Sequence, residues 1–514
     1  MSKLAIGVAI DSIEELSNWE AKLLADILAD SRFELRDIVE NRSPAKTAAP
    51  LALRLLQRGE QMVFARNTSS LAREVKSQLL RITADNGSAF SGVDIFIRLT
   101  ADALPRRVLD RTRLGELSLD FVDRKTAGYD WAGFREVRNG SPFTKVVVNF
   151  RASAGEPPQP LAGASYGTKF CATVNGAFLK EKSVILLMRE LRRIADSGEL
   201  KPAAAVQPTE AEHSPSYRDL PPYLRRLAGN ILTKALVVGR TRLGLKARSW
   251  GVHIGSGSIE DFRPSESLEL QLTPGMWAAD PFLFQWNGED YVFFECFPGN
   301  HENAWLSVAK LVDGKAELLG TCLRTSYHLS YPFVFNDGDD IYLIPETHQT
   351  GRVEIWKSVE FPLKWELHAT ALEGQSPADT VMFKTKGQWW LLTSLSDHSD
   401  FMDHCSELYA FAVDGPALTS VVPHKRNPVI IGSDIARNAG RVHLVGDRLL
   451  RPSQCNSHGV YGYGLNIQEI TRLDADEYSE RPLRLIEPNF KPGIVACHHV
   501  DFLGGRFVID LCRA

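Results

Sequence analysis

Short apolar runs alternate with segments of helical period from the beginning of the chain to about residue 197. The apolar run at 4–10 predicts a buried strand and the β-branched segment at 144–150 a further strand, whereas residues 13–29 repeat apolar positions with the period of a helix. Strands that alternate with helices in this way are typical of βαβ units and a parallel sheet. The pattern therefore predicts one α/β domain over residues 1–197.

The composition changes over residues 198–248, which we interpret as a linker with a helical segment. Several prolines and an alanine run interrupt any regular pattern in its first half. Residues 231–245 are apolar but contain Lys234, Arg240 and Arg242, so no transmembrane segment is expected. A linker helix docked on a domain is the favoured interpretation, and peripheral contact with a membrane surface is the alternative.

From residue 249 to 514 the pattern becomes short strands separated by Gly, Asn and Asp turns. One unit recurs at a spacing of roughly 50 to 60 residues, as expected for propeller blades. Each copy has a small or polar entry, an apolar strand, a glycine-containing turn and a second apolar strand, which predicts an all-β five-bladed β-propeller. A β-sandwich is the alternative, because such hairpins are common. The five copies cover 278–295, 329–346, 377–394, 435–453 and 495–511.

A polar residue stands at the entry of the first strand in every copy. In a propeller the innermost strand of each blade faces one central axis, so these side chains are expected to converge on one pocket. Because His498 and His499 are adjacent, an extended strand would point them to opposite faces, and only one is expected to face the axis. The entry residues are Asp280, Tyr331, Asp379, Arg437 and the His498–His499 pair.

Residues 115–150 follow the course of a segment found in methionyl-tRNA and sugar formyltransferases. Residues 1–197 resemble the Rossmann-like domain of that family, with Ser118 and Asp120 where the family has Asn and His. The catalytic Asp of the family has no clear counterpart after Phe150. The resemblance therefore implies a formyltransferase-like fold whose proton-transfer site is degenerate.

The second half resembles two groups of five-bladed propellers. One is that of glycoside hydrolases acting on furanosides, and the closer one is the amino-terminal domain of plant glucosamine inositolphosphorylceramide transferases. Bacterial two-domain proteins that join such a propeller to a formyltransferase-like domain look most similar. The motifs that carry the resemblance lie at 277–284, 330–335, 344–346, 378–383, 439–441 and 451–454.

Three carboxylates are candidate catalytic residues: Asp280, Asp379 and Glu346. The resemblance to the hydrolases implies that Asp280 is a base or nucleophile and that Asp379 tunes a partner acid. Glu346 follows an aliphatic strand, where capping of a loop is the alternative role, and a turn before Pro281 is the alternative for Asp280. Glycoside cleavage needs two carboxyl groups across the scissile bond. The fourth blade lacks the acid Glu of the hydrolases.

Further residues are candidates for substrate binding. Arg437, Arg441 and Arg451 cluster in the fourth blade, and guanidinium groups bind phosphate or carboxylate with paired hydrogen bonds. They predict a sugar or nucleotide-sugar ligand that carries phosphate; ion pairing with nearby aspartates is the alternative. The remaining candidates are Glu295, Tyr331, Gln454 and His499, and Tyr461 is among the aromatic residues suited to stack on a sugar.

Composition narrows the possible partners and compartment. Among 514 residues, 59 are Lys or Arg and 63 are Asp or Glu, so the net charge of −4 gives no general reason to expect a nucleic-acid partner. The seven cysteines never form C-x-x-C, which favours reduced thiols in the cytoplasm. No phosphate-binding or dinucleotide-binding glycine motif is present, and neither a cofactor nor a metal is predicted.

Together these patterns favour a carbohydrate-active enzyme of the glycosyltransferase or glycoside hydrolase type. Glycosyl transfer at the propeller axis is preferred slightly over cleavage. One alternative is a formyltransferase that acts on an amino-sugar with formyl-tetrahydrofolate. The other is a non-catalytic sugar-binding module.

Overall fold

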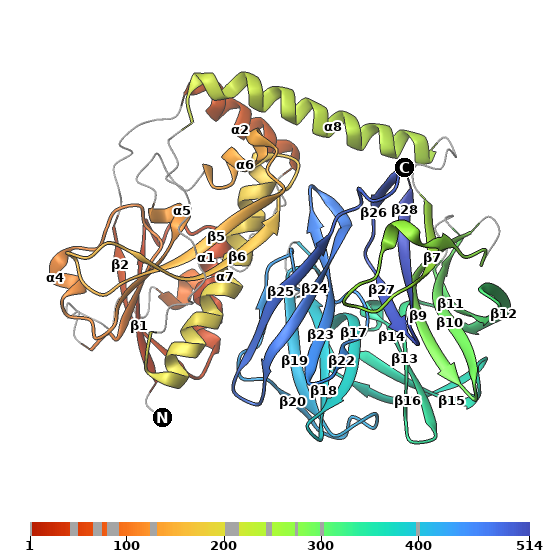
Figure 1. Ribbon diagram of the computed structural model, residues 1–514. Coiled ribbons are helices and arrows are strands. Elements are labelled where there is room, and N and C mark those ends of the chain that lie inside the picture. Colours follow the sequence, from red (N-terminus) through yellow and green to blue (C-terminus); the bar gives the residue numbers. More distant parts are fainter. Residues whose placement is uncertain are drawn as a thin grey trace. The chain divides into compact units, whose positions relative to one another are not determined.

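The chain divides into two compact units, Met1–Ala235 and Leu236–Ala514 (Figure 1). No helix in the described part of the chain is both long enough and apolar enough to cross a membrane. The computed structural model describes residues 3–41, 50–64, 74–79, 92–123, 131–200, 215–242, 249–272, 276–298, 303–396 and 401–513.

The first unit is an α/β domain built on a six-stranded sheet with the order β2-β1-β3-β4-β5-β6. The predicted parallel pairing holds for β1 to β4. The sheet is nevertheless mixed, because β5 pairs antiparallel with both β4 and β6. Only residues 152–158 join β5 to β6, too few for the crossover that parallel strands need. The strands are β1 Leu4–Ile10, β2 Phe33–Glu40, β3 Ile95–Arg98, β4 Gly115–Leu119, β5 Phe143–Arg151 and β6 Gln159–Gly167.

Helices α1, α2 and α6 pack against the long helix α7, Ala172–Ser197, which also lies against β5 and β6. A capping box formed by Ser17 and Glu20 starts α1, Asn18–Ala29. Helix α6, Phe134–Asn139, ends at Gly140 with φ 67°, a left-handed conformation that glycine adopts readily. The other helices are α2 Leu51–Phe64, α4 Arg106–Leu109, α5 Asp120–Asp123 and α8 Leu220–Arg242.

The second unit is a five-bladed β-propeller, which confirms the repeat pattern. Each blade is a sheet of four or five strands. Blade one holds β9 Trp277–Trp286, β10 Glu289–Phe297, β11 Trp305–Val312 and β12 Lys315–Leu323; blade two β13 Ser330–Asp337, β14 Asp340–Glu346, β15 Val353–Glu360 and β16 Lys364–Ala371; blade three β17 Ser376–Thr385, β18 Gln388–Ser396, β19 Glu407–Val413, β20 Val421–Pro423 and β21 Ile430–Ile431; blade four β22 His443–Val445, β23 Arg448–Ser457, β24 Val460–Leu473 and β25 Tyr478–Ile486; blade five β26 Ile494–Ala496, β27 Val500–Leu503, β28 Arg506–Arg513, β7 Ser249–Ser256 and β8 Leu268–Glu269.

Strands from both ends of this unit build the fifth blade. Strand β7, the first in the sequence of the propeller, pairs antiparallel with β28, the last, over their whole length (Figure 1). Strand β8 then pairs with β7 on the outside of the blade. The closing strand satisfies backbone groups that would otherwise form an open sheet edge.

A bulge at the same place in blades one to three explains how the predicted entry residues reach the axis. Asp280, Tyr331 and Asp379 have φ of 50°, 49° and 49°, a left-handed conformation that is uncommon for residues other than glycine. The pairing register of each innermost strand shifts at this position. The extra residue interrupts the strand alternation and re-aims the side chain.

Candidate active site at the propeller axis

Hydrogen bonds among the entry residues connect the blades across the axis. The backbone N–H of Tyr331 donates to Asp280 Oδ2 at 3.2 Å, and the N–H of Asp280 donates to Asp510 Oδ2 at 3.1 Å. The Tyr331 hydroxyl meets the backbone of Gly440, whose N–H donates to it at 2.9 Å. Gly440 has φ 148°, and a Cβ there would come within 2.0 Å of the Val500 carbonyl oxygen, which explains the glycine of the A-G-R motif.

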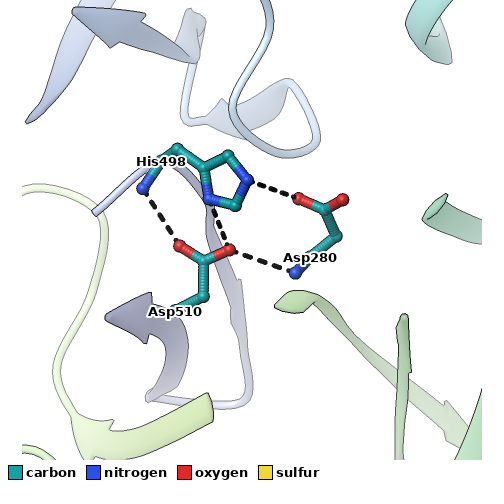
Figure 2. Close-up of side chains that lie close together, drawn as sticks. All are labelled: Asp280, His498 and Asp510. Carbon is teal, nitrogen blue, oxygen red and sulfur yellow. Dashed lines mark hydrogen bonds and ion pairs between the residues drawn. The ribbon is translucent and has the colours of Figure 1, made fainter. Parts of the chain in front are cut away.

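Asp280, His498 and Asp510 form a buried triad (Figure 2). His498 Nδ1 lies 2.6 Å from Asp510 Oδ2, and its Nε2 lies 3.6 Å from Asp280 Oδ1. The backbone N–H of His498 also donates to Asp510 Oδ1 at 3.0 Å. Asp510 therefore fixes the imidazole so that its other nitrogen faces Asp280.

The electrostatics of the triad favour protonated Asp280 and protonated His498. Burial raises the pKa of Asp280 well above its usual range, and the carboxylates of Glu295 and Asp510 add to this effect against the opposing influence of His498. Burial lowers the pKa of His498, but Asp510 and Asp280 outweigh it and raise the pKa to about 9. Asp510 stays ionised, because the imidazolium overcomes burial and lowers its pKa.

The expectation that only one of the two adjacent histidines faces the axis is wrong. His499 Nδ1 lies 3.8 Å from Asp280 Oδ1, almost as close as the nearest nitrogen of His498. Residues 497–499 are not part of a strand, and the N–H groups of both histidines donate to Asp510 Oδ1. The turn around this carboxylate removes the strict alternation of an extended strand. The His499 ring packs against Phe282 and Tyr331.

A second cluster centres on Arg437. Its Nε and one terminal nitrogen donate to the two oxygens of Asp379 at 2.6 and 3.1 Å, and the same nitrogen donates to Glu346 Oε2 at 2.9 Å. Gln454 Nε2 donates to Asp379 Oδ2 at 3.0 Å. The structure thus brings together four residues that the sequence singled out, and the guanidinium is engaged by carboxylates of this chain.

The buried carboxyl groups of Asp379 and Glu346 both contact Arg437, but their pKa values shift in opposite directions. Burial and the neighbouring Glu346 raise the pKa of Asp379 above its usual range despite the bonds to Arg437. Burial also acts on Glu346, but Arg437 and His348 outweigh it and hold the pKa of Glu346 below its usual range. The two carboxyl groups therefore titrate as a coupled pair, in which Asp379 takes up a proton more readily than Glu346 does.

Histidines and a tyrosine lie beside these two clusters. His348 Nδ1 is 2.9 Å from Glu346 Oε1, and His328 Nε2 is 3.4 Å from Glu295 Oε1. The Tyr461 ring lies 5.2 Å from the Arg437 guanidinium and 5.4 Å from the His498 ring. Because Tyr461 is 48% exposed, it offers an aromatic face next to both clusters.

Two predicted binding residues have structural partners, Arg441 between blades and Arg451 within blade four. Arg441 donates to Asp501 and to the Leu283 carbonyl, and so links blades four, five and one. Arg451 is fully buried and donates to both oxygens of Glu480 at 2.6 and 2.8 Å. These contacts account for the two guanidinium groups, and substrate binding by them stays a prediction.

The triad also has the composition of a small metal site. One ligand atom from each of Asp280, His498 and Asp510 lies within 4.8 Å of the others. A metal there would be held by the two carboxylates and by a neutral His498 imidazole, so its binding would displace the imidazole proton.

Asp510 of blade five was not identified from the sequence as a residue of the site. Its signal is an aspartate inside the apolar strand Arg506–Arg513, because a buried carboxylate is costly unless it is paired. Asp501 in Val500–Leu503 carries the same signal and pairs with Arg441. His348 and His328 carry no such signal, because His328 lies in a loop and His348 begins a short 3-10 helix between two strands.

In the first unit, Ser118 and Asp120 lie at the end of β4 and the beginning of α5, and both are buried. Asp120 Oδ1 accepts a hydrogen bond from the Val147 backbone N–H at 3.0 Å. This bond ties α5 to β5, which gives the carboxylate a structural role. Formyl transfer by this unit gains no support from the geometry.

Comparison with known proteins places the similarity in the propeller. Residues 265–496 match the family described as glucosamine inositolphosphorylceramide transferase 1, N-terminal. The transferase of that name from Oryza sativa subsp. japonica is 32% identical over 241 residues, which cover 44% of this chain and 31% of the plant protein. The one from Arabidopsis thaliana is 34% identical over 212 residues, which cover 40% of this chain and 27% of the plant protein.

The chain thus spans less than a third of the length of the curated relatives it matches. Among solved structures, a family 117 glycoside hydrolase from Zobellia galactanivorans superposes with a TM-score of 0.34 and 9% identity, over 52% of this chain and 91% of the hydrolase. The predicted similarity of the propeller to the plant transferases is confirmed. A formyltransferase-like first unit and a bacterial source stay predictions.

Proposed function

We propose that the propeller binds a carbohydrate at its axis and transfers or cleaves a glycosyl unit there. The observation that carries the proposal is the separation of pKa values among adjacent buried carboxyl groups. Asp280 is pushed toward its neutral form, while Glu346 and Asp510 are held ionised. Neighbouring acids whose environments drive their pKa values apart are the usual basis of acid–base assignment.

In this proposal Asp280 is the proton donor, in contrast to the base or nucleophile that the resemblance implied. It gives its proton to the leaving oxygen as the glycosidic C–O bond breaks. The acceptor hydroxyl, or water, forms the new C–O bond, and its proton passes to ionised Asp379, whose raised pKa makes it the better base of the two neighbouring carboxylates. The carboxylate left on Asp280 faces the imidazolium of His498, which lowers the cost of the new buried charge.

The chemistry of the ligand follows from the residues around the carboxyl groups and from the relatives. The exposed face of Tyr461 suits stacking on a sugar ring. The matched relatives are transferases of glucosamine, which favours transfer over cleavage. Phosphate recognition is the weaker part of the proposal, because a phosphate would have to compete with Asp379 and Glu346 for Arg437.

The test begins with a screen of nucleotide-sugars, glycolipids and furanosides, with products followed by mass spectrometry. On the substrate found, Asp280→Asn should lower turnover by about 10²-fold or more, since the amide donates no proton, while the melting temperature stays near that of the parent. Asp339→Asn, in an exposed turn of blade two, is the matched control and should leave turnover unchanged. Full turnover by Asp280→Asn contradicts the proposed mechanism.

A non-catalytic sugar-binding module makes a different forecast. The relatives have at least two thirds of their length outside the matched region, so sugar binding without turnover is a definite alternative. A ligand that raises the melting temperature of the protein but gives no product with any acceptor, and whose binding survives Asp280→Asn, would support that alternative.

A further inference from the structure

Helix α8 touches the first unit along one row of its surface. Tyr223 and Leu227 are buried in a cluster with Phe134, Asn230 Nδ2 donates to the Phe170 carbonyl at 2.8 Å, and Lys234 Nζ lies 3.6 Å from the centre of the Phe170 ring. These four positions are spaced by four, three and four residues, which places them on one face of a helix. This face fixes the helix on the α/β domain.

A second row of α8 is apolar and exposed. Leu224, Ala228, Ile231 and Ala235 each come one position after a residue that contacts the first unit. Successive residues of a helix are about 100° apart, so this row is turned by about 100° from the docked face. Leu224 is 42% exposed and Ile231 43%. Val238, the last member of the row, and its neighbours Leu232 and Leu236 are 51–60% exposed, so the apolar surface is wider than the row itself. The complete row is Leu224, Ala228, Ile231, Ala235 and Val238.

Charge is strongly segregated at the same place. Residues 220–259 contain seven Lys or Arg residues and no Asp or Glu. Since the whole chain carries −4 and this stretch +7, the rest of the chain carries −11. The described basic side chain Arg225 is exposed beside the apolar row. The helix therefore presents apolar and cationic groups together on a protein that is otherwise acidic.

We propose that α8 is a peripheral membrane anchor that lies flat on a bilayer surface rich in anionic lipid. A row of aliphatic side chains enters the boundary between headgroups and acyl chains, while flanking basic residues meet lipid phosphates. An anionic bilayer accepts both the apolar row and the cationic side chains along the whole helix. Its negative charge attracts the basic segment and repels the rest of the acidic chain. The inference goes beyond the proposed function and does not depend on it.

Flotation of the full chain with vesicles tests the anchor. One set of vesicles is phosphatidylcholine alone, and the other contains about 30% phosphatidylserine, which supplies the negative surface. We expect binding to the anionic vesicles, weak binding to the neutral ones, and loss of binding as salt rises because the attraction is screened. Equal binding to both sets, or none to the anionic set, overturns the proposal.

Variants assign the binding to α8. Arg225→Glu changes the charge by two and should weaken partitioning by about 30-fold, whereas Arg225→Lys should preserve it. Ile231→Gln should weaken it by about tenfold through loss of apolar insertion. Leu485→Gln is the control, because Leu485 is an exposed leucine on the propeller strand β25, and this variant should bind as the parent does.

The alternative occupant of the apolar row is protein, either another part of this chain or a second copy. In that case Ile231→Gln would lower the melting temperature or dissociate an oligomer and leave vesicle binding unchanged. That combination overturns the anchor. Because all the substituted side chains are exposed, melting curves near that of the parent will show that the variants are folded.

Discussion

Three ionisable side chains share a buried site at the axis, and the number of protons they hold decides whether the site is stable. With Asp280 neutral, His498 protonated and Asp510 ionised, the triad has no net charge, which limits the cost of burying it. If Asp280 loses its proton, the imidazolium becomes the shared partner of two carboxylates. The triad is therefore suited to a temporary negative charge on Asp280, as proton donation requires.

The raised pKa of His498 predicts a stability that depends on pH. A folded-state pKa of about 9 lies above the ordinary value of 6.5, so the protonated ring stabilises the fold fully below about pH 6.5 and loses this contribution as pH rises through about 9. The contribution is roughly 3 kcal/mol. We expect His498→Gln to be much less stable than the parent at about pH 6, and the gap to close by about pH 10.

Denaturant unfolding of both proteins across this range measures the gap. His368→Gln, on the edge strand β16 of blade two, is the control for loss of a histidine elsewhere in the propeller. A constant gap between His498→Gln and the parent at all pH values would mean that His498 is neutral in the folded protein, and the proton balance of the triad would then be wrong.

The blades themselves were predictable because each is a local pattern. Alternating apolar residues on both sides of a glycine-containing turn specify a hairpin within about 20 residues, and the recurrence of that pattern specifies the number of blades. Convergence of Asp280, Tyr331 and Asp379 followed from the common place of these residues in the repeat. The left-handed bulges did not follow, because most aspartates have a negative φ even though aspartate is enriched at positive φ, and tyrosine is not enriched there.

The hairpin turns of the blades differ in how well their residues suit the backbone conformation of the turn. In blade one, Asn287 and Gly288 occupy the turn with φ of 51° and 77°, while in blade three Lys386 and Gly387 have φ of 49° and 83°. Asparagine tolerates this conformation better than lysine does. Lys386 is exposed and so free of packing constraints.

We therefore expect Lys386→Asn to stabilise the protein by about 0.5–1 kcal/mol, because it relieves backbone strain in the turn. Thermal melting should show an increase of one to a few degrees. The reverse change in blade one, Asn287→Lys, should lower the melting temperature by a similar amount. Unchanged melting for both variants would show that the turn conformation costs nothing here.

For the molecule as a whole, the closure of the ring was the part that local patterns could not reveal. Strand β7 pairs with β28, about 250 residues later in the chain, and nothing in the residues Ser249–Ser256 identifies that partner. The same long-range character explains why the partnership of Asp280 with Asp510 was missed. The pairing of β7 with β28 and the contact of Asp280 with Asp510 both require that the fifth blade lies beside the first in the closed ring.

Ring closure leads to a prediction about truncation. The propeller from residue 249 to 514 contains all five blades, including both partners of the closing pair, so it should fold without the first 248 residues. A shorter fragment that begins at residue 276 lacks β7 and β8. Strand β28, which lies inside the complete blade, then becomes an unpaired edge strand. Unsatisfied strand edges promote pairing between chains.

Circular dichroism, thermal melting and size-exclusion chromatography of the two fragments separate the outcomes. The 249–514 fragment should be monodisperse and melt cooperatively, whereas the 276–514 fragment should aggregate or melt at a much lower temperature. Because Asp510 lies on β28, an unsupported β28 should also disturb the triad with Asp280. If the shorter fragment melted as the longer one does, the stability of the propeller would come from packing within blades, and closure by β7 would be dispensable.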